Sequence, residues 1–173
     1  MTPDELFEAA IAVVLGAEGG FQKDPDDSGN WTGGAVGAGT LKGTKYGISA
    51  AAYPNEDIES LTRERAVDLY RRDYFDPLHL DLLPPALAVA AFDCGVNQRH
   101  PPITWIQQTL GVTPDGVIGP KTIAAAEANP GLALRDFMAF RGVRYGLDPN
   151  FPRFGHTWMI RTLDLYRYCL SLL

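Results

Sequence analysis

The sequence predicts a mainly α-helical fold with a small, irregular β-hairpin after the first helix. Its 173 residues are 46% hydrophobic and 21% charged, which is typical of globular proteins. Segments with helical character follow one another from residue 49 to the end of the sequence. By contrast, ten of the 18 glycines lie between Gly16 and Gly47, which indicates a loop-rich segment. This length fits one compact domain or two small fused ones.

The first helix is expected to run from Pro3 to about residue 17. Thr2 as N-cap and Glu5 three residues later form a capping box, with Pro3 at the first helical position. The Gly19-Gly20 pair ends this helix. Residues 20–47 then predict a loop that contains the irregular hairpin. Further helices are expected over residues 49–53, 62–75, 85–96, 103–110, 120–128, 130–145 and 157–172.

Charge is distributed unevenly along the chain, whose formal net charge is −6. Residues 1–130 carry nine Lys or Arg and eighteen Asp or Glu, whereas residues 131–173 carry six Arg and three Asp. An acidic body argues against nucleic acid as the main partner, because binding phosphates needs a basic face. The basic C-terminal segment, residues 131–173, is either a solvated helical face or a peripheral contact with an anionic cell envelope.

The cysteine content and the first five residues bear on the chemistry of the protein and on its cellular compartment. Cys94 and Cys169 are too few for a disulfide framework and lack metal-ligand spacing, so we expect buried free thiols. We expect no cofactor and no metal site, since the three histidines lie far apart. The acidic residues 1–5 do not resemble the basic start of a signal peptide, so no export signal is expected.

Glu18 is the candidate general acid. On a helix that begins near Pro3, it shares one face with Phe7, Ile11 and Val14. A carboxyl at the end of an apolar stripe is partly desolvated, which disfavours its charged form, as in the general acids of glycosidases. The other interpretation is an ordinary exposed glutamate at a helix end.

A glycosidase needs a second carboxylate that faces the acid across the sugar. Asp24, Asp26 and Asp27 follow Glu18 closely and are the candidates. Each of them is equally suited to a turn or a helix cap.

Ordered sequence blocks extend over nearly the whole chain. They are Glu18-Gly19-Gly20-Phe21, Asp24-Pro25-Asp26-Asp27, Lys45-Tyr46-Gly47-Ile48-Ser49, residues 70–77, 92–97, 110–112 and 115–122, and Phe154-Gly155-His156-Thr157-Trp158 with Arg161. Together they resemble glycoside hydrolase family 108, whose N-acetylmuramidases occur in phage endolysins and in bacterial proteins once called secretion activators. The resemblance implies a lysozyme-like α+β fold. It also implies a catalytic region over residues 1–90 and a helical peptidoglycan-binding region over residues 91–173, packed into the same globule.

The resemblance also implies roles for particular residues. Glu18 matches the family's proton donor. Asp27 and Thr44 are similar to the residues of phage-type lysozymes that position the attacking water, although Thr32 competes with Thr44 because residues 31–43 are inserted between Asp27 and Thr44. The expected reaction is hydrolysis of the β-1,4 bond between N-acetylmuramic acid and N-acetylglucosamine. Carboxyl groups ~6.5–9.5 Å apart would indicate inversion, and about 5 Å would indicate a covalent intermediate.

Substrate-binding candidates lie in both halves. Asn97 and Gln98 offer amide groups to N-acetyl and hydroxyl groups, on a helix end expected to line a cleft opposite Glu18. Tyr46 and Tyr70 are candidates for stacking on a sugar, or for the core. Peptidoglycan glycan strands are thus the expected partner of a monomeric endolysin, made in the host cytoplasm and acting on the wall in the periplasm.

Two other classes of function stay open. One is a non-catalytic wall-binding or secretion-accessory protein that keeps the fold. The other is an amidase, in which Cys94, His156 and Asn97 would imitate a cysteine peptidase triad.

Overall fold

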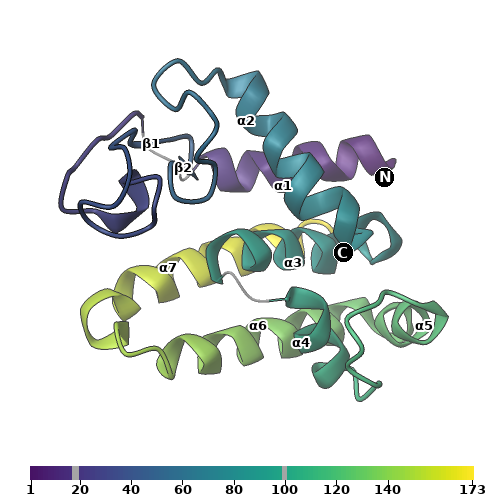
Figure 1. Cartoon of the computed structure of the whole chain (residues 1–173). Helices are drawn as coiled ribbons and strands as arrows, with labels where there is room; N and C mark the ends of the chain where they lie inside the picture. Colours follow the sequence, from purple (N-terminus) through teal and green to yellow (C-terminus); the bar gives the residue numbers. More distant parts are fainter. Residues whose placement is uncertain (17–19, 99–100) are drawn as a thin grey trace. The chain divides into compact units, whose positions relative to one another are not determined.

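The computed structural model describes residues 1–16, 20–98 and 101–173 (Figure 1). In these ranges the helices and strands are α1 (Pro3–Gly16), β1 (Thr44–Lys45), β2 (Ile48–Ser49), α2 (Arg63–Tyr70), α3 (Pro85–Gln98), α4 (Pro102–Thr109), α5 (Pro120–Ala128), α6 (Pro130–Gly146) and α7 (Phe151–Leu170). The predicted fold class is confirmed: the described residues are mainly helical, with one small antiparallel sheet. None of the described helices has the length and apolarity needed to cross a membrane.

The beginning of α1 confirms the predicted capping box. The Thr2 backbone N–H donates to the Glu5 carboxylate at 2.7 Å, and the Glu5 N–H donates to the Thr2 hydroxyl at 3.2 Å. These bonds hold the pKa of Glu5 below its ordinary value. The cap therefore satisfies two of the N–H groups that a helix start leaves without partners.

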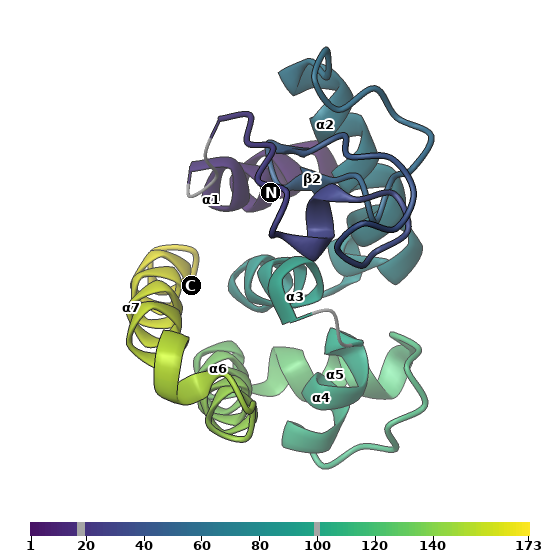
Figure 2. The same ribbon diagram turned by 60° about the vertical axis from the view of Figure 1, so that its left-hand side comes forward.

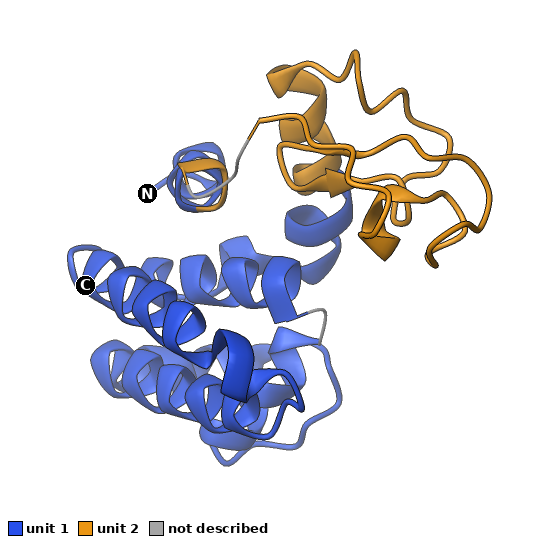
Figure 3. Ribbon diagram, turned by 90° about the vertical axis from the view of Figure 1, so that its left-hand side faces the viewer, with its two compact units in different colours: residues 1–13, 72–173 blue, residues 14–71 orange. Residues whose placement is uncertain are grey.

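The chain forms two compact units (Figure 3). Unit 1 contains Met1–Val13 and Arg72–Leu173, and unit 2 contains Val14–Arg71. This division is set by which residues lie close together in space. The expected division between residues 90 and 91 was instead based on the sequence blocks that resemble the family. Helix α3 runs through residue 90 without a break. The functional division stays a prediction.

Unit 1 is built around α3, which packs against α4, α6 and α7 (Figure 2). Every residue from 86 to 95 is buried, since five of these ten are alanine or glycine and let neighbouring helices approach from several sides. Phe7 of α1 meets Phe75 and Phe92 edge-on, with ring centroids 5.2 and 6.0 Å away. Burial of these three rings contributes to the core that positions the end of α3.

Unit 2 contains the small sheet, in which Thr44 lies opposite Ser49 and Lys45 opposite Ile48. Tyr46 and Gly47 connect the two strands and both have positive φ, 52° and 75°. A two-residue connection with positive φ at both positions matches the right-handed twist of a hairpin. Isolated bridges join Gln22 to Thr44 and Trp31 to Leu41, so the glycine-rich loop folds back on the sheet.

Three expected helices differ from the observed structure by more than two residues. The helix over residues 49–53 is wrong: Ser49 pairs with Thr44 in the sheet, and residues 50–52 form a turn. The α-helix expected to end at residue 75 ends at Tyr70, and a π-helix follows it over Arg71–Phe75. Helix α7 begins at Phe151 instead of residue 157, since a proline in the first turn of a helix disrupts no backbone hydrogen bond.

Candidate functional site

Glu18, the candidate acid, lies outside the described residues, and its role stays a prediction. The apolar face that precedes it is described. Phe7, Ile11 and Val14 are each at most 1% exposed, as the helical spacing predicts.

Asp27 is exposed and caps a short 3-10 helix over Ser28–Asn30. One carboxylate oxygen accepts the Gly29 backbone N–H at 2.8 Å. The other accepts the side-chain amide of Gln22 at 3.1 Å. The carboxylate is therefore held in one orientation by a backbone and a side-chain donor.

Asn30 is fully buried and joins Asp27 to Thr44 through hydrogen bonds. Its side-chain oxygen accepts the Thr44 hydroxyl proton at 2.7 Å and the Gln22 amide at 3.1 Å. Its own amide donates to the Gln22 side-chain oxygen at 2.7 Å and to the Asp24 carbonyl at 2.9 Å. We refer to Gln22, Asp27, Asn30 and Thr44 as the Asn30 cluster.

The Asn30 cluster brings two of the predicted catalytic residues into one hydrogen-bond network. Sequence reasoning missed Asn30 and Gln22. An asparagine in a glycine-rich loop carries no signal that it will be buried, and its partners lie eight and fourteen residues away. Because Thr44 gives its one hydroxyl proton to Asn30, the remaining lone pairs of its oxygen are acceptors only.

Thr32, the competing threonine, has a different environment. Its hydroxyl accepts the Thr40 backbone N–H at 2.9 Å, and its own N–H donates to the Thr40 carbonyl at 3.0 Å. These bonds close the inserted loop beside the Trp31–Leu41 bridge. Thr44, unlike Thr32, shares a hydrogen-bond network with Asp27 through Asn30 and Gln22, and which of the two threonines acts with Asp27 stays a prediction.

Of the two candidate tyrosines, Tyr46 lies in the turn of the hairpin and Tyr70 bonds to that turn. The Tyr70 hydroxyl donates to the Tyr46 carbonyl at 3.1 Å, and Tyr70 is 2% exposed. The Tyr46 ring is half-buried, with the Lys45 ammonium 5.6 Å from its centre. Tyr70 therefore supports the left-handed backbone at Tyr46, and sugar stacking by either ring stays a prediction.

Asn97 and Gln98 lie at the end of α3 in unit 1, beside a buried ion-pair network. Asp93 accepts from Arg141 at 2.8 Å, from Arg161 at 2.9 Å and from the Asn97 amide at 2.9 Å. The Gln98 oxygen accepts the Arg141 Nε–H at 2.7 Å. Both amide side chains are thus oriented by the network, which sequence reasoning also missed.

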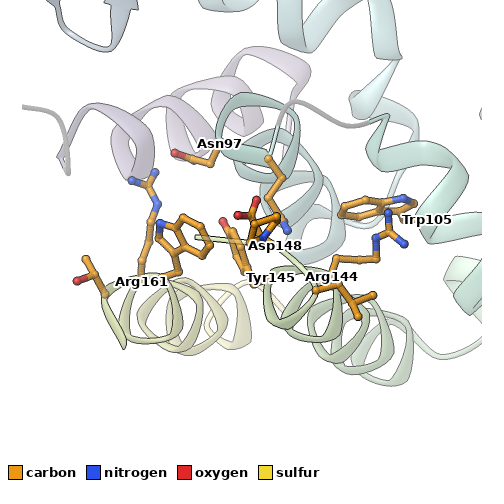
Figure 4. Close-up of a pocket in the computed structure, with 11 residues that line it drawn as sticks. Asn97, Trp105, Arg144, Tyr145, Asp148 and Arg161 are labelled. Carbon is orange, nitrogen blue, oxygen red and sulfur yellow. The ribbon is translucent and has the colours of Figure 1, made fainter. Parts of the chain in front are cut away.

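A pocket of about 670 Å³ opens beside this network (Figure 4). The lining residues labelled there are Asn97, Trp105, Arg144, Tyr145, Asp148 and Arg161. Trp158 also lines the pocket, with its ring centroid 5.0 Å from that of Tyr145. The pocket therefore combines flat aromatic surfaces with charged groups, a combination common in ligand sites.

The two thiols are not suited to nucleophilic chemistry. Cys94 and Cys169 are buried, and burial raises the pKa of each thiol to about 12. A nucleophilic cysteine needs the thiolate near neutral pH, so these values disfavour the amidase alternative. Within residues 1–16, 20–98 and 101–173, no three His, Cys, Asp or Glu side chains gather in a way that could hold a metal ion.

Comparison with known proteins gives the family. Residues 11–98, which are 88 of the 173, match the family model described as Glycosyl hydrolase 108. The chain belongs to glycoside hydrolase family 108. The matched stretch contains Glu18 and the whole Asn30 cluster, and it ends at Gln98.

A solved structure agrees with this family assignment. The chain is similar to Brucella abortus SagA, with a TM-score of 0.79 and 26% sequence identity over 98% of this chain and 96% of that one. No curated protein matches the sequence. The predicted family and lysozyme-like fold class are confirmed, and membership in family 108 supports a glycosidic, peptidoglycan-related function.

Proposed function

We propose that this family 108 protein is an N-acetylmuramidase, which cleaves the β-1,4 bond between N-acetylmuramic acid and N-acetylglucosamine in peptidoglycan. The observation that carries the proposal is the Asn30 cluster. It holds a carboxylate and a threonine oxygen in one network, within the stretch that matches a family of glycoside hydrolases. A carboxylate and a second acceptor are what an enzyme needs to orient an attacking water.

In the proposed reaction, Glu18 protonates the glycosidic oxygen as the bond breaks. A water hydrogen-bonded to Asp27 and Thr44 attacks the anomeric carbon, and Asp27 takes up its proton. Asn30 acts as a positioning residue, since it accepts the Thr44 proton and thereby leaves the Thr44 oxygen to accept from the water. This sequence of steps describes an inverting hydrolase.

The proposal includes a biological setting. A muramidase of this kind would serve as a phage endolysin, made in the host cytoplasm and acting on the wall in the periplasm to lyse the cell. The sequence resemblance to endolysins supports this setting. The competing function is a non-catalytic wall-binding or secretion-accessory protein of the same fold.

The first test is the loss of turbidity of purified peptidoglycan with wild type and with Glu18→Gln, followed by mass spectrometry of the fragments. We expect the wild type to release muropeptides with reducing N-acetylmuramic acid ends. Glu18→Gln should be slower by about 10²–10⁴-fold, the usual contribution of a general acid. Glu8→Gln, which changes an exposed glutamate of α1, is the matched control and should act like the wild type.

Asp27→Asn extends the same assay to the second residue. Asparagine keeps an oxygen that can accept the Gly29 N–H, so the cap remains while the charge is lost. The bond from the exposed Gln22 amide is lost, because asparagine has only one side-chain oxygen. We expect slow hydrolysis with only a small fall in the thermal unfolding midpoint. Full activity of Asp27→Asn would show that Asp27 only caps the 3-10 helix and takes no part in hydrolysis. Binding of the wall without any turnover by the wild type would favour the non-catalytic function.

A further inference from the structure

The wall of the pocket in unit 1 carries more positive than negative charge. Asp93 is the single carboxylate bonded by two guanidinium groups, those of Arg141 and Arg161. Within the part of the chain that the structure describes, neither arginine is paired with a second carboxylate. Arg141 and Asp93 are each 1% exposed, so water screens the surplus charge poorly. Arg161 lines the pocket and brings this surplus to its surface.

A second cation lies at another part of the wall. The Arg144 guanidinium stacks over the Trp105 ring at 5.2 Å and is exposed, with no ion pair among the described residues. Asp148 is the one carboxylate among the described lining residues, and it accepts the Asn150 backbone N–H at 2.8 Å. In Figure 4, Arg161 and Arg144 lie on either side of Tyr145 and Asp148.

We propose that this pocket binds a carboxylate-bearing ligand, and that the ligand is the acidic peptide stem of peptidoglycan. This inference rests on the proposed function for its source of ligand. An arginine recognises a carboxylate by two parallel charge-assisted hydrogen bonds. The Tyr145 and Trp158 rings offer an apolar surface for the side chains next to that carboxylate.

The charge of the pocket is the reason to assign the peptide and not the glycan. Where a stem peptide is attached, the lactyl carboxyl of N-acetylmuramic acid is part of a neutral amide bond, so the glycan itself is uncharged there and surplus guanidinium charge contributes little to binding it. Stem peptides carry free carboxylates at intervals along a short chain. An anionic ligand is also attracted over several ångströms by the unbalanced charge, and this attraction weakens with added salt.

The test is a calorimetric titration of the wild-type chain with three probes: a free stem tetrapeptide, the same peptide with its carboxylates amidated, and a peptide-free N-acetylglucosamine oligosaccharide. The tetrapeptide contains no glycosidic bond, so the outcome does not depend on Glu18 or on turnover. We expect the amidated peptide to bind at least about tenfold more weakly than the free one. Raising the salt concentration should weaken the binding of the free peptide and leave that of the amidated peptide unchanged.

Three variants test whether the tetrapeptide binds in this pocket. Arg144→Gln should weaken tetrapeptide binding by about fivefold. Arg153→Gln is the matched control, because Arg153 is an exposed arginine stacked on a ring, that of Phe154, but does not line the pocket. Asp148→Asn removes the opposing charge while keeping an acceptor for Asn150, so it should strengthen binding by about two- to fivefold.

Two outcomes would overturn the inference. Tetrapeptide binding that neither Arg144→Gln nor amidation changes would show that the charges of the pocket do not recognise the ligand. Saturable binding of the oligosaccharide alone, lost in Trp158→Ala, would make the pocket a glycan site. In either case hydrolysis by wild type and its loss in Glu18→Gln would still be measured separately, so the muramidase proposal stands or fails by itself.

Discussion

Burial sets the chemistry of individual side chains in this protein, and the two cysteines show it most directly. Cys94 lies in α3 and Cys169 in α7, both without exposed surface. The buried surroundings stabilise the neutral thiol and raise its pKa from 9.0 to about 12. Both residues therefore behave as small apolar side chains and not as nucleophiles.

Thiol titration with a disulfide reagent at pH 8 checks this description. A pKa that is three units higher lowers the thiolate fraction by about 10³, so both thiols of the folded protein should react at least that much more slowly than in urea. Rapid reaction of the native protein would contradict the burial of the thiols.

The same pKa values predict how stability depends on alkaline pH. A thiol whose pKa is raised on folding stabilises the protein fully below about pH 9, and this stabilisation is lost as the pH rises toward 12. The free energy of unfolding should fall by about 1.4 kcal/mol per pH unit for each thiol in that interval. Denaturant unfolding of wild type and Cys94→Ala at pH 8 and pH 10.5 isolates the contribution of one thiol from those of lysine and tyrosine.

At the scale of elements, the glycine-rich loop of unit 2 is shaped by backbone conformations that only glycine adopts easily. Gly43 has a φ of 90° and lies directly before β1. A Cβ at this position would overlap the Gln22 carbonyl oxygen and come within 2.8 Å of the Phe21 ring. That carbonyl accepts the Thr44 N–H, so Gly43 permits the bridge on which the Asn30 cluster rests.

We therefore expect Gly43→Ala to destabilise the protein by more than the ~1–2 kcal/mol that a left-handed backbone costs a residue with a Cβ. Gly37→Ala is the control, because Gly37 also has positive φ, 78°, but its added Cβ meets no atom within 4 Å. Urea unfolding of the two variants measures the difference. Equal destabilisation would mean that the loop relaxes around the new methyl group.

At the scale of the whole molecule, Asp93 connects helices that are distant in sequence. It accepts hydrogen bonds from Arg141 of α6 and Arg161 of α7, 48 and 68 residues away. Replacing the buried carboxylate would leave two guanidinium groups with no opposite charge, which is far more costly than losing an exposed ion pair.

Asp93→Asn should lower the free energy of unfolding by about 3–5 kcal/mol, which thermal or chemical denaturation would measure. Asp164→Asn is the control: Asp164 lies in α7 and its ion pair with Arg167 is long, 3.9 Å, and exposed. This control should be nearly neutral. If the two variants lost the same stability, the buried network would not be what ties α3, α6 and α7 together.

Local sequence patterns were sufficient for much of the fold. The Thr2 and Glu5 capping box and the bounds of α5 were predicted from residues within one or two turns, and the structure has them at those positions. The helix expected over residues 49–53 failed for the opposite reason. Ser49 pairs with Thr44 across a hairpin, and such a contact overrides a local preference for helix.

The sequence by itself determined the family and the mainly helical fold class, because these depend on residue types in short, ordered blocks. Through the resemblance to that family it also supplied Glu18, Asp27 and Thr44 as candidates. Only the tertiary structure decided that Asn30 is buried between Asp27 and Thr44, that Tyr70 supports a turn, and that one carboxylate serves two arginines beside a pocket. Burial and the choice of hydrogen-bond partners depend on which distant segments pack together. A periodic pattern along the chain does not contain that information.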